Sequence, residues 1–268
     1  MPKNGTGIYA LKRYGQHWLE DPDMLTRIVA AAELSGQETV LEIGPGTGSL
    51  TKHLLAIAPV VAVEVDPRLT ASLRQRFSHC PHFQLIEGDI TRMDPPTTPG
   101  VVVANIPYNI SSPILEKLLG SATHPHRQFS CLVLLMQKEL AERICAQEGS
   151  RTYGALSVRL QYLAQCELVF PVPRRFFRPP PRVDSAVIRL RPRAFSEPLN
   201  SPDLFEQVVR QAFATRRKML HNCLKSLVEE EFLRAVMEEL GLNPQARAED
   251  ISVVNFVKLV NRLEGAKS

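Results

Sequence analysis

Short apolar runs alternate with longer amphipathic segments between residues 39 and 190. The short apolar runs with strand character span residues 39–44, 60–65, 83–86, 101–106 and 129–136. Segments long enough for helices separate them, and this alternation predicts βα units around a buried parallel sheet. Two further runs, at 167–172 and 185–190, predict a hairpin at the sheet edge. The pattern therefore predicts an α/β fold with a mostly parallel sheet of seven strands.

Helical patterns flank this region. Asp21-Pro22 predicts a helix start, because an N-cap residue is followed by proline at the first helical position. Beyond Arg193 the strand pattern stops, and the segment 196–202 predicts a linker that ends in a Ser-Pro helix start. The apolar positions that follow have helical spacing. We therefore expect an α/β domain over residues 1–195 and a small all-helical domain over residues 196–268.

Composition favours a globular protein. With 44% hydrophobic and 22% charged residues and a net charge of +4, the chain can bury a core and is too balanced for a disordered binding tail. No apolar run is long enough to span a bilayer, and the polar leader lacks the pattern of a secretory signal. The five cysteines are scattered without a Cys-x-x-Cys pair. We therefore expect no membrane segment, no metal site and a reducing cytoplasmic location.

Positive charge is concentrated in one stretch. Between Pro171 and Arg193, seven arginines stand against one acidic residue, Asp184. Such a stretch predicts a surface that meets phosphates through contacts that are sensitive to salt and independent of base sequence. The candidate RNA-binding residues within it are Arg174, Arg175, Arg178 and Arg182.

The first predicted strand leads into a glycine-rich turn, Glu42-Ile-Gly-Pro-Gly-Thr-Gly48. Glycines at such a turn allow a ligand to approach the backbone closely. Ser49 interrupts the dinucleotide pattern G-x-G-x-x-G, whereas G-x-G-x-G after an acid is typical of proteins that bind S-adenosylmethionine (SAM). The turn therefore favours SAM over NAD. The candidate cofactor-binding residues here are Glu42, Gly44, Gly46 and Gly48.

Acidic residues follow the next two predicted strands. Glu64 lies at the end of the second strand, where a carboxylate can accept both ribose hydroxyl protons of an adenosine. Asp89, next to Ile90, closes the third strand and can accept from the adenine amino group. Either acid alone is more often an ordinary strand end. Three strand ends in order, each with a suitable residue, favour a SAM site.

The fourth strand ends in Asn105-Ile-Pro-Tyr108, the most specific motif in the chain. An adenine N6 is a poor nucleophile because its lone pair is delocalised into the ring. If the Asn105 oxygen and a backbone carbonyl near Pro107 each accept an N6 hydrogen, the nitrogen faces the sulfonium methyl with a less conjugated lone pair. No strong base is then required. The competing interpretation is a simple turn after a strand.

Aromatic residues near this motif are candidates for stacking on a base. Tyr108 is expected to stack on the target ring. Phe177 precedes a run of prolines that can hold it rigidly, and we expect it to provide a second stacking face. Phe176 is expected in the core instead.

Four segments together resemble the small-subunit ribosomal RNA adenine dimethyltransferases of the KsgA/RsmA type. The segments are 16–19, 41–51, 105–113 and 177–187, and residues 213–220 of the helical region are also similar to that family. The resemblance covers nearly the whole chain. It implies a Rossmann-like SAM-dependent methyltransferase domain. One departure is visible, since the leader has Gln-His-Trp-Leu where the commonest family form is Gln-Asn-Phe-Leu, and we expect altered leader packing rather than lost binding.

The resemblance implies transfer of two methyl groups to N6 of each of two adjacent adenosines near the 3′ end of small-subunit rRNA. The substrate would be a pre-assembled small-subunit precursor, the product S-adenosylhomocysteine, and the wider role ribosome biogenesis. The matching segments add Gln16, His17 and Leu19 to the candidate SAM contacts. They also add Arg216, Arg217 and Lys218 to the candidate RNA contacts.

Three alternatives stay open at this point. An Erm-type enzyme would methylate adenine in large-subunit rRNA, although residues 177–187 and 213–218 favour the small subunit. A non-catalytic RNA-binding or assembly factor is the second, and the intact motif of Asn105, Pro107 and Tyr108 argues against pure binding. A DNA adenine methyltransferase is the third, disfavoured because no target-recognition domain is evident. We expect a monomer, since no exposed apolar stripe is obvious.

Overall fold

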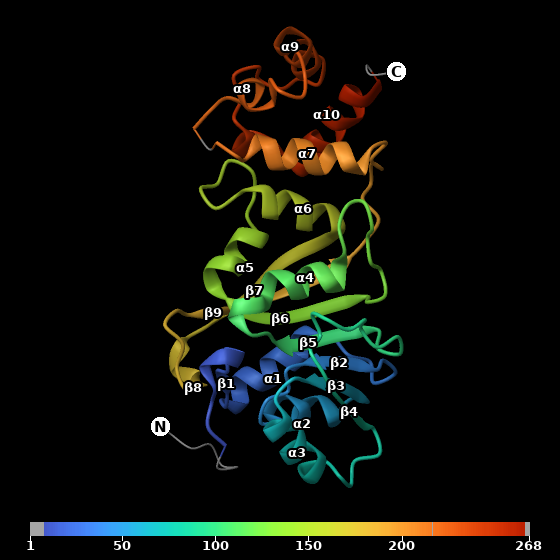
Figure 1. Ribbon diagram of the computed structural model, residues 1–268, viewed down its shortest axis with the longest axis vertical. Coiled ribbons are helices and arrows are strands. Elements are labelled where there is room, and N and C mark those ends of the chain that lie inside the picture. Colours follow the sequence, from blue (N-terminus) through green and yellow to red (C-terminus); the bar gives the residue numbers. More distant parts are fainter. Residues whose placement is uncertain (1–7, 216, 266–268) are drawn as a thin grey trace. The chain divides into compact units, whose positions relative to one another are not determined.

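A computed structural model describes residues 8–215 and 217–265, and the chain divides into two compact units (Figure 1). The first unit comprises the chain up to Leu118 together with His126–Ala141 and Glu167–Pro192. The second comprises Leu119–Pro125, Glu142–Cys166 and the chain from Arg193 onward. The second unit thus includes two segments that lie before the boundary expected after residue 195.

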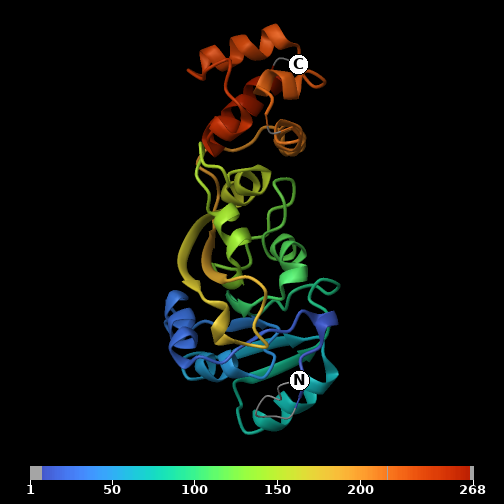
Figure 2. The same cartoon turned by 90° about the vertical axis from the view of Figure 1, so that its left-hand side faces the viewer.

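A seven-stranded sheet runs through the α/β part in the order β4-β3-β2-β5-β6-β9-β7. Its strands are β2 (Val40–Ile43), β3 (Val60–Glu64), β4 (Phe83–Glu87), β5 (Val101–Asn105), β6 (Cys131–Gln137), β7 (Ala164–Val172) and β9 (Ser185–Pro192). The first five strands in that order pair in parallel, whereas β9 is antiparallel to β6. Figure 2 shows β7 and β9 side by side at the sheet edge. The predicted fold class is confirmed.

The central parallel strands of the sheet are buried on both faces. All residues of β2 and β3 are buried, as is expected of strands with helices on both sides. The helices of this region are α1 (Pro22–Ala31), α2 (Ser49–Leu55), α3 (Pro67–Arg76), α4 (Ser111–Leu119), α5 (Lys138–Ile144) and α6 (Ala155–Leu163). Apolar side chains of α1 and α2 form one core with β2, β3, β5 and β6. Asp21 caps α1 as predicted, since its side chain accepts from the backbone nitrogen of Met24 at 3.0 Å.

A small second sheet was not expected from the sequence. It consists of β1 (Trp18–Leu19) and β8 (Phe177–Arg178), which pair antiparallel. In this pairing Trp18 is opposite Arg178 and Leu19 is opposite Phe177. Two-residue strands are too short to show a periodic pattern. The pair nevertheless joins the leader to the proline-rich loop between β7 and β9.

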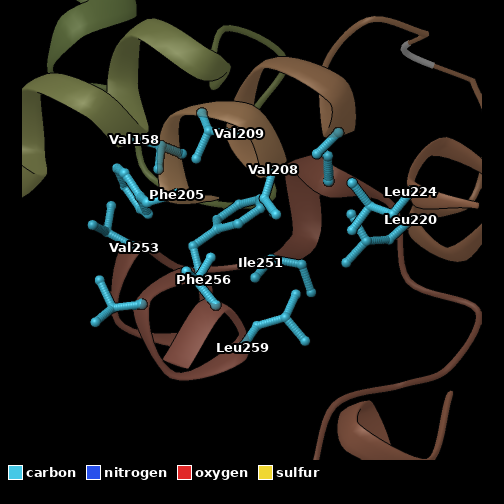
Figure 3. Packing of buried hydrophobic residues seen from close by; sticks show 14 of the residues in the cluster. Val158, Phe205, Val208, Val209, Leu220, Leu224, Ile251, Val253, Phe256 and Leu259 are labelled. Carbon is cyan, nitrogen blue, oxygen red and sulfur yellow. The ribbon is translucent and has the colours of Figure 1, made fainter. Parts of the chain in front are cut away.

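The second unit has a helical core of its own (Figure 3). Its C-terminal helices are α7 (Pro202–Ala212), α8 (Leu220–Leu224), α9 (Glu230–Glu239) and α10 (Val253–Gly265). Phe205 of α7 and Phe256 of α10 are fully buried there, and Val158 of α6 belongs to the same cluster. Ser201 caps α7, as the Ser-Pro pattern predicted. Within the described residues, no helix combines the length and apolarity needed to cross a membrane.

Candidate active site

A cavity lies at the carboxyl ends of neighbouring strands of the sheet. Parallel strands place these ends at one edge, and ligands of open α/β sheets bind there. The lining residues come from the ends of β2, β3 and β5, from the segment after β4 and from the leader. They are Tyr14–Trp18, Ile43, Gly44, Gly46, Val63–Val65, Leu69, Gly88–Ile90, Asn105–Tyr108 and Ile110.

Most of the predicted site residues meet in this cavity. Those that line it are Gln16, His17, Gly44, Gly46, Glu64, Asp89, Ile90, Asn105, Pro107 and Tyr108. Those that do not are Leu19, Glu42, Gly48 and Phe177. Tyr14, Val65 and Leu69 also line the cavity. They could not be predicted, because a single apolar or aromatic side chain in a leader, strand end or helix has no distinctive pattern.

Two glycines of the turn after β2 serve close packing. Both have positive φ, 60° at Gly46 and 81° at Gly48. A Cβ on Gly46 would lie 2.8 Å from Cδ1 of Trp18, and one on Gly48 would lie 2.7 Å from Cε2 of Phe77. The absence of a side chain at Gly46 therefore lets the indole of Trp18 lie against the turn. The absence of one at Gly48 leaves room for Phe77, at the C-terminal end of α3, to pack against the same turn.

Glu64 ties the glycine turn to the end of β3. One carboxylate oxygen accepts from the backbone nitrogen of Gly46 at 3.1 Å, and the other accepts from Val65 and Asp66 at 3.0 and 2.9 Å. Burial raises the pKa of Glu64, although these hydrogen bonds act in the opposite direction. The carboxylate is therefore rigidly held while it faces the cavity.

Glu42 lies behind the glycine turn instead of in the main cavity. Its side chain is buried and lines a smaller hollow next to Trp18 and Asn105. Burial raises the pKa of Glu42 to about 8, and the negative charge of Glu64 acts in the same direction. The side chain therefore carries a proton at neutral pH. This placement differs from the direct cofactor contact that the sequence suggested.

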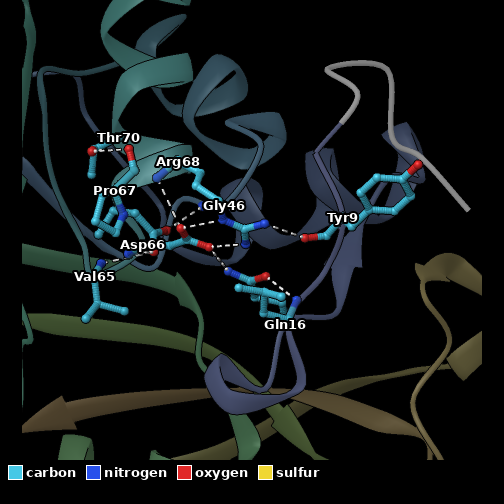
Figure 4. A network of polar contacts seen from close by, with 10 residues as sticks. Tyr9, Gln16, Gly46, Val65, Asp66, Pro67, Arg68 and Thr70 are labelled. Carbon is cyan, nitrogen blue, oxygen red and sulfur yellow. Dashed lines mark hydrogen bonds and ion pairs between the residues drawn. The ribbon is translucent and has the colours of Figure 1, made fainter. Parts of the chain in front are cut away.

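A polar network holds the leader at the end of β3 (Figure 4). The side-chain nitrogen of Gln16 donates to the fully buried carboxylate of Asp66 at 2.9 Å, and its oxygen accepts from the backbone nitrogen of Leu11 at 2.8 Å. Arg68 donates to the same carboxylate at 2.6 Å and to the carbonyl of Tyr9 at 3.3 Å. Burial alone would raise the pKa of Asp66, but the hydrogen bonds from Arg68 and Gln16 outweigh it and lower the pKa.

Asp66 and Arg68 are functional candidates that the sequence analysis missed. The signal was present, since Asp66-Pro67 has the same form as the Asp-Pro start of α1. Asp66 caps α3 by accepting from the backbone nitrogen of Arg68 at 3.1 Å. The same carboxylate also accepts a hydrogen bond from Gln16 of the leader. Only the tertiary contact with Gln16 distinguishes it from an ordinary N-cap.

Asn105, His17 and Tyr108 form a connected group beside the cavity. The side-chain nitrogen of Asn105 donates to the carbonyl of His17 at 2.9 Å. The rings of His17 and Tyr108 are stacked, with centroids 5.7 Å apart and an interplanar angle of 24°. Nδ1 of His17 lies 2.8 Å from the carbonyl oxygen of Pro179, which can only accept, so Nδ1 carries a proton. Burial raises the pKa of Tyr108, which remains a neutral phenol.

Asp89 keeps one carboxylate oxygen for other partners. Its Oδ1 accepts from the backbone nitrogen of Thr91 at 2.9 Å and from the Thr91 hydroxyl at 2.7 Å. These bonds lower the pKa of Asp89, so the group is ionised at neutral pH. Oδ2 lies 3.5 Å from Nε of the exposed Arg92. The arrangement leaves Oδ2 able to accept from a ligand in the cavity.

Phe177 is not placed as predicted, whereas Phe176 packs against the core in a partly buried position. Phe177 is 1% exposed and packs in the core under the sheet, so it does not provide a stacking face in this structure. Its strand pairing with Leu19 turns the side chain inward. Phe176 is only half-buried, with the guanidinium of Arg175 5.0 Å from its ring centroid.

The arginine-rich stretch separates into two groups. The predicted RNA-binding residues Arg174, Arg175, Arg178 and Arg182 are all exposed. Arg178 forms an ion pair with Glu20 at 3.1 Å. Arg189 and Arg191 on β9 also form ion pairs, with Glu33 and Glu167. Their side chains are only 15% and 36% exposed, against 70% for Arg178, so the second group is less accessible to phosphates than the first.

The remaining candidates lie in the second unit. Arg217 and Lys218 are exposed in the connection between α7 and α8, and Arg216 lies outside the described residues. In the part of the chain that the structure describes, no three His, Cys, Asp or Glu side chains gather as a possible metal site.

Comparison with known proteins gives consistent similarities. A family model described as "Ribosomal RNA adenine dimethylase" matches residues 9–265. The chain is 60% identical to the "Ribosomal RNA small subunit methyltransferase A" of Gloeobacter violaceus over 96% of this chain and 94% of that protein. Among solved structures, a dimethyladenosine transferase from Plasmodium falciparum is 30% identical with a TM-score of 0.83, covering 94% of this chain and 98% of that one. The 23S rRNA methyltransferase ErmE is also 30% identical, with a TM-score of 0.75 over 92% and 99% of the two chains.

Proposed function

This chain belongs to the ribosomal RNA adenine dimethylase family, and on that premise we propose that it transfers methyl groups from SAM to N6 of adenosines in small-subunit rRNA. The observation that carries the proposal is the shared cavity. It joins a glycine turn, two strand-end acids and the Asn-Ile-Pro-Tyr motif in one place. A protein that only binds a ligand would need either the glycine turn or the Asn-Ile-Pro-Tyr motif. A methyltransferase needs both in one cavity, because the methyl donor and the target nitrogen must meet there.

The cavity residues fit the adenosine half of SAM. The rigid carboxylate of Glu64 suits the ribose hydroxyls, and Oδ2 of Asp89 suits the adenine amino group. Val65, 40% exposed, and Ile90 line the same cavity and offer apolar surface to the adenine ring. SAM supplies an electrophilic methyl group on a sulfonium sulfur. The protein residues bind and orient both reactants.

The target nitrogen is oriented by acceptors at the end of β5. Because the Asn105 amide nitrogen is engaged by the carbonyl of His17, its oxygen is the atom that accepts an N6 hydrogen. The Pro107 carbonyl already accepts from Ile110 and from the Ser111 hydroxyl, both at 3.2 Å. We therefore assign the second acceptor to the carbonyl of Ile106, which also lines the cavity.

The chemistry requires positioning more than proton abstraction. With both N6 hydrogens held, the lone pair is less delocalised and is directed at the methyl group. The N6 proton becomes acidic only after methylation and then leaves to water or to the same acceptors. Tyr108 stacks on the target base and keeps it in the plane that these acceptors define.

The substrate assignment rests on the similarity to small-subunit enzymes. The relative from Gloeobacter violaceus is named for the small ribosomal subunit and matches this chain over nearly its full length. We propose that the targets are two adjacent adenosines near the 3′ end of the rRNA, each dimethylated within a small-subunit precursor during ribosome biogenesis. We propose that the protein acts as a monomer. All five cysteines are free thiols, which supports a cytoplasmic location.

A second candidate is methylation of large-subunit rRNA, which the similarity to ErmE favours. The deciding experiment offers labelled SAM with undermethylated small subunits, large subunits or naked DNA, followed by nucleoside analysis. Dimethyladenosine on small subunits alone is the expected result. Label on large subunits would support the ErmE-like activity instead. No label, with small subunits still bound, would indicate an assembly factor without catalysis.

A further inference from the structure

Ser185 is a buried polar residue outside the site described above that contacts the target-stacking ring. It is the first residue of β9, is fully buried, and pairs with Gln137 at the end of β6. Its Oγ lies 2.5 Å from the hydroxyl oxygen of Tyr108. The sheet therefore holds this hydroxyl group in a fixed place at the distal end of the tyrosine ring.

Tyr108 itself stands on a short and less regular support. It begins a three-residue 3-10 turn, Tyr108–Ile110, between β5 and α4. The Ser111 hydroxyl stabilises the backbone of this turn through the carbonyls of Pro107 and Tyr108, at 3.2 and 3.4 Å. Backbone contacts alone do not select one rotamer for the two side-chain torsions of a tyrosine. A contact at the hydroxyl restrains both, because it acts at the far end of the ring.

The face of the ring is supported separately. His17 stacks against Tyr108 and is itself held by the carbonyl of Pro179. A stacked neighbour limits tilting of the ring but allows it to slide in its own plane. The hydrogen bond to Ser185 prevents that sliding. Together the two contacts define one ring position relative to the Asn105 oxygen.

We propose that Ser185 is a positioning residue for methyl transfer, acting through the hydroxyl of Tyr108. The inference rests on the proposed function, in which the target adenine stacks on Tyr108 while Asn105 accepts from N6. A displaced ring would carry the base with it and move N6 away from its acceptors. Since rate depends steeply on such alignment, loss of the hydroxyl contact should lower turnover more than binding.

A double-mutant cycle tests the coupling between the two hydroxyls. The variants are Ser185→Ala, Tyr108→Phe and the combination, each assayed for kcat and KM on undermethylated small subunits. We expect either single change to lower kcat roughly tenfold while KM for SAM stays within about twofold. The double variant should lose no more than either single variant, because both remove the same contact.

A matched control separates this role from stability alone. Ser157 in α6 is also fully buried, and its hydroxyl donates to the carbonyl of Arg143 at 2.5 Å. Ser157→Ala should lower the thermal unfolding midpoint about as much as Ser185→Ala and leave kcat unchanged. The proposal would be overturned if Ser185→Ala lowered the unfolding midpoint but left kcat normal. It would also be overturned if the fold-decrease in kcat of the double variant equalled the product of the two single decreases. If the wild-type protein methylates no RNA, the proposed function fails and the role of Ser185 fails with it. If the wild type is active but the two decreases in kcat are independent, only the role of Ser185 is wrong.

Discussion

The side-chain amide of Asn105 donates to the backbone carbonyl of His17 across 2.9 Å. This bond joins the catalytic motif after β5 to the leader, and it determines which end of the amide is left for a substrate. The amide oxygen becomes the acceptor because the nitrogen is already used. In the proposed function, the leader therefore helps to orient the target nitrogen, and its residues line the cavity proposed for SAM.

Replacing Asn105 should separate binding from catalysis. Asn105→Ala removes the N6 acceptor and one leader contact, but it leaves the Gln16–Asp66 anchor of the leader and every predicted ribose and adenine contact in place, so the Kd for SAM should change less than about threefold. Turnover should fall by roughly two orders of magnitude, the scale expected for loss of one orienting group. Calorimetric SAM titration and single-turnover methylation measure the two quantities. Asn109→Ala, which changes an exposed amide in the same turn, is the control. The assigned role would be contradicted if Asn105→Ala lost SAM binding but kept normal turnover at saturating SAM.

The exposed arginines should contribute to the salt dependence of RNA binding. Replacing Arg178 and Arg182 by alanine should weaken affinity and reduce the magnitude of the slope of log K against log salt by up to about 2, since each phosphate contact contributes roughly 0.7 to 0.9. Filter binding to small subunits over a range of salt concentrations measures the slope. Arg191→Gln is the control, because Arg191 lies beside two carboxylates, Glu33 and Glu167, and its side chain is about half as exposed as that of Arg178. A slope that stays the same in the double variant would show that these arginines contact no phosphate.

Release of the leader should weaken SAM binding. Gln16→Ala removes the hydrogen bond to Asp66, and a bond to a charged group contributes on the order of 1.5 kcal/mol, or about tenfold in an equilibrium constant. The Kd for SAM should therefore rise by up to about tenfold, with a smaller change in kcat at saturating SAM. Gln37→Ala, at an exposed glutamine, controls for loss of an amide. An unchanged Kd in Gln16→Ala would mean that the network holds the leader for folding only.

The buried carboxyl of Glu42 should make stability depend on pH. Its pKa is about 8 in the folded protein and near the ordinary value of 4.5 when unfolded. Between these values the folded state binds one more proton than the unfolded state, so stability falls as pH rises, by about 1.4 kcal/mol per pH unit.

Glu42→Gln tests this effect. The variant lacks the titrating group, so its free energy of unfolding should not show this decrease. The free energy of unfolding of Glu42→Gln minus that of the wild type should therefore increase from pH 5 to pH 8. Urea unfolding at several pH values measures the difference, and Glu231→Gln controls for loss of an exposed carboxylate. A difference between wild type and Glu42→Gln that is constant with pH would show that Glu42 does not retain its proton on folding.

Local patterns were sufficient for much of the fold and for part of the site. The Asp21-Pro22 and Ser201-Pro202 starts depend on contacts within one helical turn, so the sequence predicted both correctly. Each predicted strand was a short, mostly apolar run, and residues at the carboxyl ends of parallel strands must share one edge. That geometry explains why Glu64, Asp89 and Asn105 could be grouped before any coordinates were known.

The sequence by itself therefore determined the α/β class, the helical C-terminal region and the ordered set of strand-end residues, because these follow from short-range periodicity and turn chemistry. Only the tertiary structure decided contacts between distant segments. The pairing of Leu19 with Phe177 buries a ring expected at the cavity, and Arg189, held in its ion pairs on β9, is less accessible to phosphates than Arg178. These contacts depend on which distant residue lies opposite in the folded chain. Periodicity along the sequence reports only on neighbours within one helix or strand, so it does not predict them.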